Sequence, residues 1–469
     1  MTATDPQTGV PYPLYDCFLD DQGTYPTPAT MEDRAWFERA RLGMFVHWNH
    51  SSVAACEISW AMHHQGMEMA EYEALATRFN PVDFSADAWV ELAQEAGMGY
   101  LLLVVKHHDG FAMWDTRTSD YKITNTPFGR DVCREIADAC HRAKMPLGWY
   151  YSPADWWHPA SRAADWDTYV PYMQAQLREL MTEYGQIDFL AFDYWSPACM
   201  HASWAEFYRE LRGLCPHFLH SRNTPWAIGD YEVMEHRSPY FRDPHSTTLS
   251  GITAGPGFTS RMTCAAPFEV LLSIQPRRWS FATGDAKPLD ECVRALVDAA
   301  GSGGNLTLNV TPNASGVIPA PQAQRLRELG AWMATHGQAI VGTQGGPLPP
   351  LLAYEADTAS GADALDMLGS GGVRPPHTRC RVSCTSAGQR LYLHVIKEPT
   401  DLALVLPTEV ATHIVSCHLL NGDPLPTIIR DDALWITLPR SEPDLVIVVN
   451  LSVPAEVLPP IAPVLAHSI

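Results

Sequence analysis

The stretch at residues 100–114, YLLLVVKHHDGFAMW, decides how the rest of the sequence is interpreted. Its first half contains five consecutive aliphatic residues, 101–105, which predict a strand buried on both faces. Lys106, His107, His108 and Asp109 follow at once, before a turn at Gly110. Burying so many polar groups costs free energy, so a strand that ends in such a run indicates a functional site. In a β/α barrel, functional groups lie where strands end and βα loops begin.

Strand and helix patterns alternate on both sides of this stretch. The other expected barrel strands are residues 42–48, 146–152, 187–195, 217–222 and 303–310. The expected helices are residues 31–41, 86–96, 130–144, 169–184, 202–214, 289–300 and 322–336. This many repeats in one α/β chain favour a (β/α)8-like barrel, with residues 221–266 rich in loops. An open doubly wound sheet is the alternative, but no G-x-G-x-x-G motif follows any strand.

The Pro- and Gly-rich residues 342–352 are typical of a linker between domains. Short β-rich runs follow at residues 390–396, 402–406, 413–420, 433–438 and 444–450. Short strands at regular spacing predict a small antiparallel β-sandwich. We therefore expect a catalytic barrel with an N-terminal extension over residues 1–345 and a C-terminal β-sandwich, with a supporting role, over residues 346–469.

Composition disfavours several classes of function. The 469 residues carry 32 basic and 53 acidic side chains, and a net charge of −21 repels nucleic acid and anionic membranes. No apolar run approaches the ~18 residues of a transmembrane helix, and no secretory signal pattern opens the sequence. The 11 cysteines are scattered without a C-x-x-C pair, which indicates reduced thiols and a cytoplasmic protein.

Asp193 is the better placed of two aspartates in residues 187–195, IDFLAFDYW. It follows the expected end of the strand, whereas Asp188 lies at its start, the wrong end of a barrel for a functional group. Tyr194 and Trp195 stand next to it and could stack on a sugar ring. An isolated aspartate at a strand end is otherwise a helix cap or a salt-bridge partner. Two carboxylates, one as nucleophile and one as proton donor, suffice to hydrolyse a glycosidic bond.

Five motifs occur in order between about residues 41 and 343. They are HW at 47–48, KHHDGFAMWDT at 106–116, GWYYSPADWW at 148–157, IDFLAFDYW at 187–195 and GSGGNLTLNVTPNASGVIP at 301–319. Together they resemble the α-L-fucosidases of glycoside hydrolase family 29. The resemblance implies a (β/α)8-like barrel followed by a β-sandwich. It also implies hydrolysis of terminal α-L-fucosides with retention, through a covalent glycosyl-enzyme and without a metal or other cofactor.

The resemblance also implies roles for particular residues. The nucleophile falls on Asp193, and the general acid/base falls on Glu235, which we expect in a mobile loop, with Glu232 and Glu269 as alternatives. The residues expected from it to bind the substrate are His47, His107, His108, Tyr150, Tyr151 and Arg222. Apart from the resemblance, the expected set includes Glu57 and the rings of Trp60, Trp156 and Trp279, which could pack on the apolar face of a sugar. Within this set the choice between Tyr150 and Tyr151 stays open, and the role of Glu57 is unsettled because its surroundings depart from the family pattern.

Some of these residues allow other interpretations. Adjacent histidines at a strand end are expected to point in opposite directions, which disfavours a metal site at His107 and His108. Lys106 is expected to form an ion pair beside Asp109 rather than a Schiff base. His63 and His64 are expected to be loop histidines, close enough to the aromatic residues to be weak site candidates.

Departures from the family around residues 49–50, 57–60 and 277–283 touch the expected sugar site. A related sugar such as an α-L-galactoside, which adds one hydroxyl group, is therefore an alternative substrate. A sugar-binding barrel without catalytic activity is the alternative from a different class. We expect a small oligosaccharide or glycoside as the partner, and a homo-oligomer is compatible with the resemblance.

Overall fold

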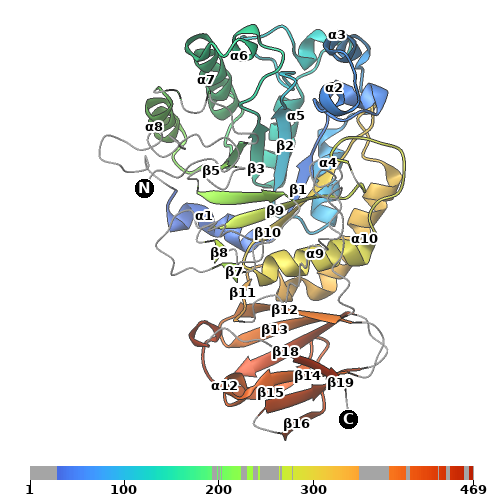
Figure 1. Cartoon of the computed structure of the whole chain (residues 1–469), viewed down its shortest axis with the longest axis vertical. Coiled ribbons are helices and arrows are strands. Elements are labelled where there is room, and N and C mark those ends of the chain that lie inside the picture. The colour runs from blue at the N-terminus through green and yellow to red at the C-terminus, as the bar shows by residue number, and fades with distance from the viewer. Residues whose placement is uncertain are drawn as a thin grey trace.

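The computed structural model describes residues 29–192, 203–222, 230–235, 267–276, 278–347, 380–397, 402–430, 433–439, 444–458 and 464–467, with residues 198, 201, 241–242 and 263–264. A barrel surrounded by helices forms the N-terminal part, and two β-sheets form the C-terminal part at the bottom of Figure 1.

Within these residues, eight parallel strands close into a barrel in the order β1-β10-β9-β6-β5-β4-β3-β2. They are β1 (Leu42–Val46), β2 (Leu101–Lys106), β3 (Leu147–Tyr151), β4 (Phe189–Phe192), β5 (Leu219–Arg222), β6 (Tyr231–Glu235), β9 (Phe268–Ser273) and β10 (Asn305–Val310). The predicted (β/α)8-like barrel is confirmed, and the open sheet is excluded because β1 pairs with both β2 and β10.

Every helix expected from the sequence is present. They are α1 (Met31–Ala40), α4 (Ala86–Glu95), α5 (Val132–Ala143), α7 (Trp166–Thr182), α8 (Trp204–Leu214), α9 (Leu289–Gly301) and α10 (Ala320–His336). Side-chain caps help to set their starts, because Ser85 accepts from the amide of Ala88 before α4 and Asp131 accepts from that of Arg134 before α5. Shorter elements in the connections are α2 (Ala61–His64), α3 (Met69–Ala74), α6 (Pro159–Arg162), β7 (Phe241–Arg242) and β8 (Thr263–Cys264).

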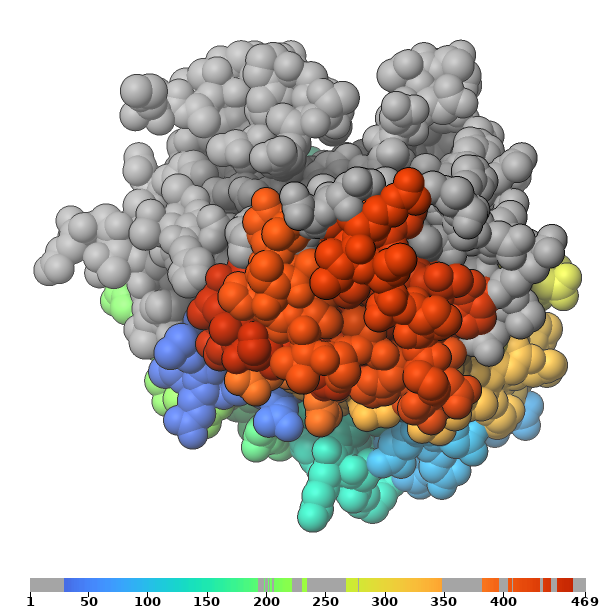
Figure 2. Space-filling model, turned by 90° about the horizontal axis from the view of Figure 1, so that it is seen from below, coloured from blue at the N-terminus to red at the C-terminus, as the bar shows by residue number. Residues whose placement is uncertain are grey.

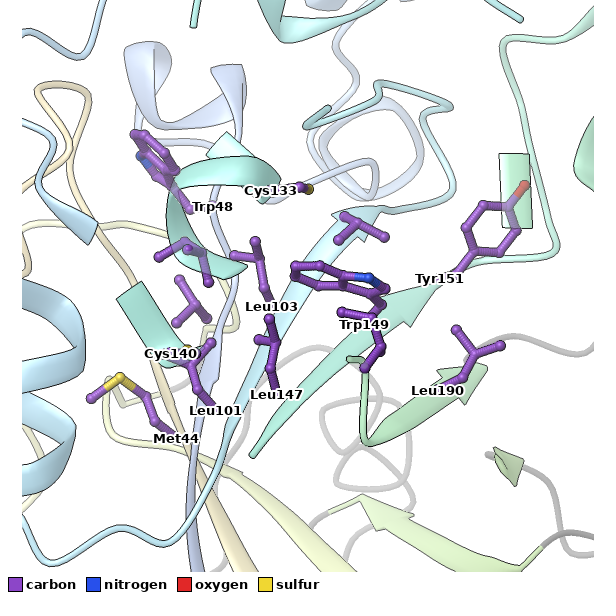
Figure 3. Packing of buried hydrophobic residues seen from close by; sticks show 14 of the residues in the cluster. Met44, Trp48, Leu101, Leu103, Cys133, Cys140, Leu147, Trp149, Tyr151 and Leu190 are labelled. Atoms are coloured by element: carbon purple, nitrogen blue, oxygen red, sulfur yellow. The ribbon is translucent and has the colours of Figure 1, made fainter. Parts of the chain in front are cut away.

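The barrel strands are buried on both faces, as predicted for residues 101–105, which are at most 1% exposed. Alternate side chains separate into two layers because successive residues of a strand point to opposite faces. Leu101, Leu103 and Tyr151 belong to the outer layer between strands and helices. Figure 3 shows part of this layer, with Trp149 and Tyr151 projecting from β3. Leu102, Val104 and Tyr150 belong to the barrel interior.

Helix α1 closes the N-terminal end of the barrel. The Phe37 ring lies 5.5 Å from the ring of Tyr100 and 4.7 Å from that of Tyr231. The backbone oxygen of Phe37 accepts a hydrogen bond of 2.8 Å from the Asn305 side chain, at the start of β10. These aromatic side chains fill the barrel floor, which leaves the C-terminal ends of the strands as the place for a functional site.

The prediction of a loop-rich segment at residues 221–266 is wrong where β6 lies. This strand pairs with β5 on one side and with β9 on the other. Its sequence, YEVME, has no aliphatic run, and among its described side chains Tyr231 and Val233 face the apolar interior. Pairing with two neighbouring strands therefore stabilises a segment whose own composition is a weak strand signal.

The C-terminal part is an antiparallel sandwich, as predicted. One sheet has the order β11-β12-β13-β18-β15 and the other β16-β17-β14-β19. Their bounds are β11 (Gln344–Gly345), β12 (Cys380–Ala387), β13 (Arg390–Lys397), β14 (Leu402–Pro407), α12 (Thr408–Ala411), β15 (Ile414–Leu419), β16 (Thr427–Arg430), β17 (Ala433–Thr437), β18 (Asp444–Leu451) and β19 (Val464–His467). Aliphatic side chains from both sheets share one core, including Leu393, Leu404 and Ile447.

Strand β12 joins the sandwich to the barrel. On one face, Ser383 Oγ donates to Asp298 of α9 at 2.9 Å, and Gly301 of α9 lies so close that an added Cβ would be 3.2 Å from the backbone nitrogen of Cys384. On the other face, Val382 and Cys384 enter the sandwich core. Seen from below, the orange-to-red C-terminal residues lie in front of the barrel, over its middle (Figure 2).

Candidate active site

Four of the expected substrate-binding rings meet at the C-terminal end of the barrel. His47 follows β1, His107 and His108 follow β2, and Tyr150 lies near the end of β3. The ring centroids of His47 and His107 are 6.0 Å apart, those of His107 and His108 are 4.1 Å apart, and Tyr150 stacks on His107 at 5.8 Å. All four side chains are buried.

The ring of His47 is held by Asn309 of β10. Asn309 donates its amide hydrogens to Ser273 Oγ at 3.1 Å and to the backbone oxygen of Trp279 at 2.9 Å, which turns its Oδ1 toward His47. Oδ1 lies 2.7 Å from His47 Nδ1 and can only accept, so Nδ1 carries the proton. In the neutral ring, Nε2 is then the acceptor nitrogen.

The ring of His107 is held by a buried network centred on Ser59 and Asp109. Ser59 Oγ lies 2.7 Å from His107 Nδ1 and accepts from the backbone amide of Asp109 at 2.8 Å. The Asp109 carboxylate accepts from Tyr72 at 2.7 Å and from Asn49 at 2.8 Å. Ser59 itself has a φ of 58°, a strained value for this residue type. This strain indicates that the surrounding contacts fix the position of its hydroxyl group.

The ring of His108 is held by Ser152, which follows β3. Ser152 Oγ donates to the backbone oxygen of Ala154 at 2.9 Å, so it accepts from His108 Nδ1 at 2.6 Å. Burial, together with the positive charge of Lys106, lowers the pKa of His108 to about 3. His108 is therefore a neutral ring of fixed tautomer at neutral pH, suited to hydrogen bonding with hydroxyl groups.

The prediction that His107 and His108 point in opposite directions is wrong. Both lie beyond β2, in a turn closed by a hydrogen bond of 3.1 Å from the Gly110 amide to the His107 carbonyl, so strand alternation no longer applies. Among the residues that the structure describes, no group of three or more His, Cys, Asp or Glu side chains could hold a metal ion.

The ion-pair partner of Lys106 is Asp155, not Asp109 as expected. A shift in the pairing of β2 with β3 between Val104 and Lys106 turns the lysine outward. Its Nζ lies 3.1 Å from Asp155 Oδ2 and 3.2 Å from Tyr169 OH, and the whole pair is buried. Gly110 passes so close that an added Cβ would be 2.4 Å from Asp155 Oδ1, and its φ of +77° also favours glycine.

The structure distinguishes the two candidate tyrosines of β3. Tyr150 points into the barrel and stacks on His107. Tyr151 points outward, where its hydroxyl donates to Gln176 of α7 at 2.8 Å and Lys106 lies over its ring. Only Tyr150 is therefore placed beside the histidines.

Glu57 holds the loop that carries Trp279. Its two carboxylate oxygens accept from the backbone amides of Trp279 at 3.2 Å and Ser280 at 3.1 Å, and burial raises its pKa. Trp279 lies 5.2 Å from the His47 ring. Glu57 thus positions an aromatic ring of the site through the backbone of that ring's loop.

We expect Glu57→Ala to raise KM about 10-fold, with a smaller loss of kcat, because two charge-assisted hydrogen bonds to this loop disappear. Glu57→Gln keeps one acceptor oxygen and should have an intermediate KM. Steady-state kinetics of both variants tests this. Equal KM values for the wild type and Glu57→Ala would contradict the positioning role.

Of the predicted catalytic residues and the neighbouring arginine, the structure describes the backbone of Glu235 and Arg222 but not Asp193. Asp193 lies outside the described residues, and the residue before it, Phe192, ends β4 in register with Tyr151 and Arg222. Arg222 ends β5, and Glu235 is the last residue of β6 rather than part of a loop. The strands that lead to all three residues therefore end at the same end of the barrel as the histidines.

Glu232 and Glu269, the two alternatives for the general acid/base, lie farther than Glu235 from the C-terminal ends of their strands. Glu232 is buried and stands three residues before the end of β6. Glu269 lies near the start of β9, where its Oε2 accepts from Thr307 Oγ1 at 2.5 Å and from Tyr100 OH at 3.2 Å. Tyr100 belongs to the barrel floor, so Glu269 lies at the end opposite the histidines.

Burial raises the pKa of Glu269 to about 7, which predicts a pH-dependent cost in stability. Below its unfolded value of 4.5, both states hold the proton and no cost exists. Between that value and about pH 7, the unfolded chain loses its proton first, so stability falls by about 1.4 kcal/mol per pH unit. We expect Glu269→Gln, which cannot ionise, to gain a few degrees in Tm over the wild type on going from about pH 5.5 to about pH 8. A Tm difference that is the same at both pH values would contradict this.

Several residues of the site were missed in the sequence. The three histidines are oriented by Asn309, Ser59 and Ser152. Asn309 is separated from His47 by 262 residues, so no local sequence pattern connects the two. Asn309 does lie within the GSGGNLTLNV motif, so the motif itself was the available signal. Ser59 carried no comparable signal.

Comparisons with known proteins agree with this architecture. The sequence model of the family described as Alpha-L-fucosidase matches residues 20–338. Plasma alpha-L-fucosidase of Rattus norvegicus is 26% identical over 344 residues, which cover 66% of this chain and 70% of that protein. Tissue alpha-L-fucosidase of Homo sapiens is 24% identical over 442 residues, which cover 88% of this chain and 86% of that protein.

Two solved structures show the same fold. Alpha-L-fucosidase isoenzyme 1 from Paenibacillus thiaminolyticus has a TM-score of 0.70 and 27% identity, and covers 90% of this chain and 99% of its own. A GH29 alpha-L-fucosidase from Bacteroides thetaiotaomicron, trapped as a covalent intermediate with 2-fluoro-fucosyl fluoride, has a TM-score of 0.69 and 19% identity. It covers 91% of this chain and 98% of its own.

Proposed function

The chain belongs to the alpha-L-fucosidase family of glycoside hydrolases, and we propose that it is a retaining exo-glycosidase that cleaves terminal α-L-fucosides. The observation that carries this proposal is the group of three histidines with fixed ring orientations at the C-terminal end of the barrel. Each imidazole can exchange hydrogen bonds with hydroxyl groups, and Tyr150 and Trp279 add aromatic surface beside them.

Two carboxylates would perform the reaction in two displacements. Asp193 attacks the anomeric carbon while Glu235 donates a proton to the glycosidic oxygen, so the bond to the leaving group breaks as the bond to Asp193 forms. Glu235, now ionised, takes a proton from water, and that water attacks the same carbon and releases Asp193. Two inversions at one carbon give a product with the starting α configuration.

The proposal is supported by sequence position and by the family. Phe192 ends β4 directly before Asp193, and Glu235 ends β6. The Bacteroides thetaiotaomicron relative was trapped as a covalent intermediate, as a double displacement requires.

The proposal also includes the cellular location of the protein and the class of its substrate. The structure describes seven cysteine side chains, and each is a free thiol, which favours the reducing conditions of the cytoplasm. No helix within the described residues is long and apolar enough to cross a membrane. A small fucosylated oligosaccharide or glycoside would be the substrate.

A panel of 4-nitrophenyl glycosides tests the proposed function. We expect the purified protein to hydrolyse the α-L-fucoside with a kcat/KM at least about 10-fold above that for the α-L-galactoside, which carries one extra hydroxyl group. A higher value for the galactoside would change the sugar but keep the mechanism. The absence of any cleaved glycoside would contradict the proposal.

A further inference from the structure

A row of aromatic rings leads from the buried histidines to the surface. The His108 ring is 1% exposed, and its centroid lies 5.5 Å from that of Trp60 and 5.0 Å from that of Trp156. Both tryptophans are half-buried. Beyond them, the exposed His64 stacks on Trp60 at 4.9 Å and 15°, and the exposed His63 lies 4.2 Å from Trp156.

The loop that carries Trp156 is held rigidly. The Trp156 amide donates to the His108 carbonyl at 2.6 Å. Asp155 Oδ1 accepts from the amides of Trp157 at 3.0 Å and His158 at 2.8 Å, while its other oxygen pairs with the buried Lys106. The buried ion pair, which no step of the reaction uses, therefore keeps Trp156 in place against His108. Such preorganisation lowers the entropic cost of binding.

We propose that Trp60, Trp156, His63 and His64 form the subsite for the sugar that is attached to the cleaved L-fucose. This inference rests on the proposed function. A pyranose ring has an apolar C–H face that packs on aromatic side chains, and its hydroxyl groups can bond to imidazole nitrogens. The departing sugar must reach solvent, and this end of the row is the exposed one.

The subsite also gives a role to residues that depart from the family pattern. Trp60 and the two histidines lie in the segment at residues 57–64, EISWAMHH, which begins with one of the parts where the sequence departs from the family. These positions would therefore set which leaving groups the chain accepts.

The test compares two substrates that differ in the leaving group. α-L-Fucosyl fluoride has no ring beyond the fucose, whereas a disaccharide of α-L-fucose and a hexose occupies the proposed subsite. For Trp156→Ala, we expect the ratio of kcat/KM for the best-cleaved disaccharide to that for the fluoride to fall about 10-fold. His63→Ala should lower the ratio about 3-fold, and Trp156→Phe, which keeps a ring, should stay near the wild type.

His217→Ala is the matched control, because His217 is an exposed histidine in the turn before β5, at the opposite end of the barrel. An unchanged ratio in a folded Trp156→Ala protein, with the fluoride still hydrolysed, would overturn the subsite alone. If the wild type cleaves neither substrate, the proposed function fails, and the subsite fails with it.

Discussion

An Asp193→Ala variant is expected to lose at least about 10³-fold in kcat on 4-nitrophenyl α-L-fucoside, which corresponds to about 4 kcal/mol of activation free energy. The first displacement has no nucleophile without this carboxylate, and water is a poor substitute because it is neither charged nor held in line with the anomeric carbon. The measurement is kcat of the purified variant beside the wild type, with equal circular dichroism spectra as evidence of folding.

Azide makes this prediction specific for the nucleophile. A small anion can occupy the space of the missing carboxylate and attack the anomeric carbon once. One displacement inverts the configuration, so Asp193→Ala with azide should form β-L-fucosyl azide from an activated fucoside. An Asp193→Ala variant with the full wild-type rate would show that the nucleophile has been placed on the wrong residue.

A Glu235→Ala variant is expected to lose about 10²- to 10⁴-fold in kcat on substrates with poor leaving groups. The loss should be much smaller for fucosyl fluoride, because fluoride departs with little help from a general acid. Azide should restore turnover by attacking the fucosyl-enzyme, and the product should be α-L-fucosyl azide after two displacements. The two variants therefore yield opposite anomers of the same azide.

Glu232→Ala and Glu269→Gln are the controls for this assignment. Glu232 lies deeper in β6, and Glu269 is bonded to Thr307 and Tyr100 near the barrel floor. If Glu235→Ala is not rescued by azide and Glu232→Ala is, the proton donor is Glu232.

Local sequence patterns predicted most of the barrel. Residues 101–105 form a buried strand because their aliphatic composition suits both layers of a closed barrel, and the helices follow from their periodicity and caps. Strand β6 was missed because it depends on pairing with β9, which is distant in sequence, whereas β12 pairs with the adjacent β13 and was missed because of its polar composition. One face of β12 is polar and still buried, since Ser383 bonds to Asp298 across the junction with the barrel.

The composition of the candidate site was easier to predict than its geometry. The motif at residues 106–116 predicted His107 and His108 as site residues, and the structure places His107 beside His47 and Tyr150. The partner of Lys106 was wrong because a shift in strand pairing, which no local pattern signals, turns it toward Asp155. Likewise, Glu57 bonds to a loop that lies 222 residues away in sequence, so its role required the folded chain.

The most direct test of the central claim is the configuration of the first sugar released from 4-nitrophenyl α-L-fucoside. Proton NMR of the reaction within its first minutes, before the anomers equilibrate, measures this directly. If the protein is a retaining α-L-fucosidase, the α anomer of L-fucose appears first and the β anomer only later. Initial release of the β anomer, or no release of fucose, would contradict the double displacement at the C-terminal end of this barrel.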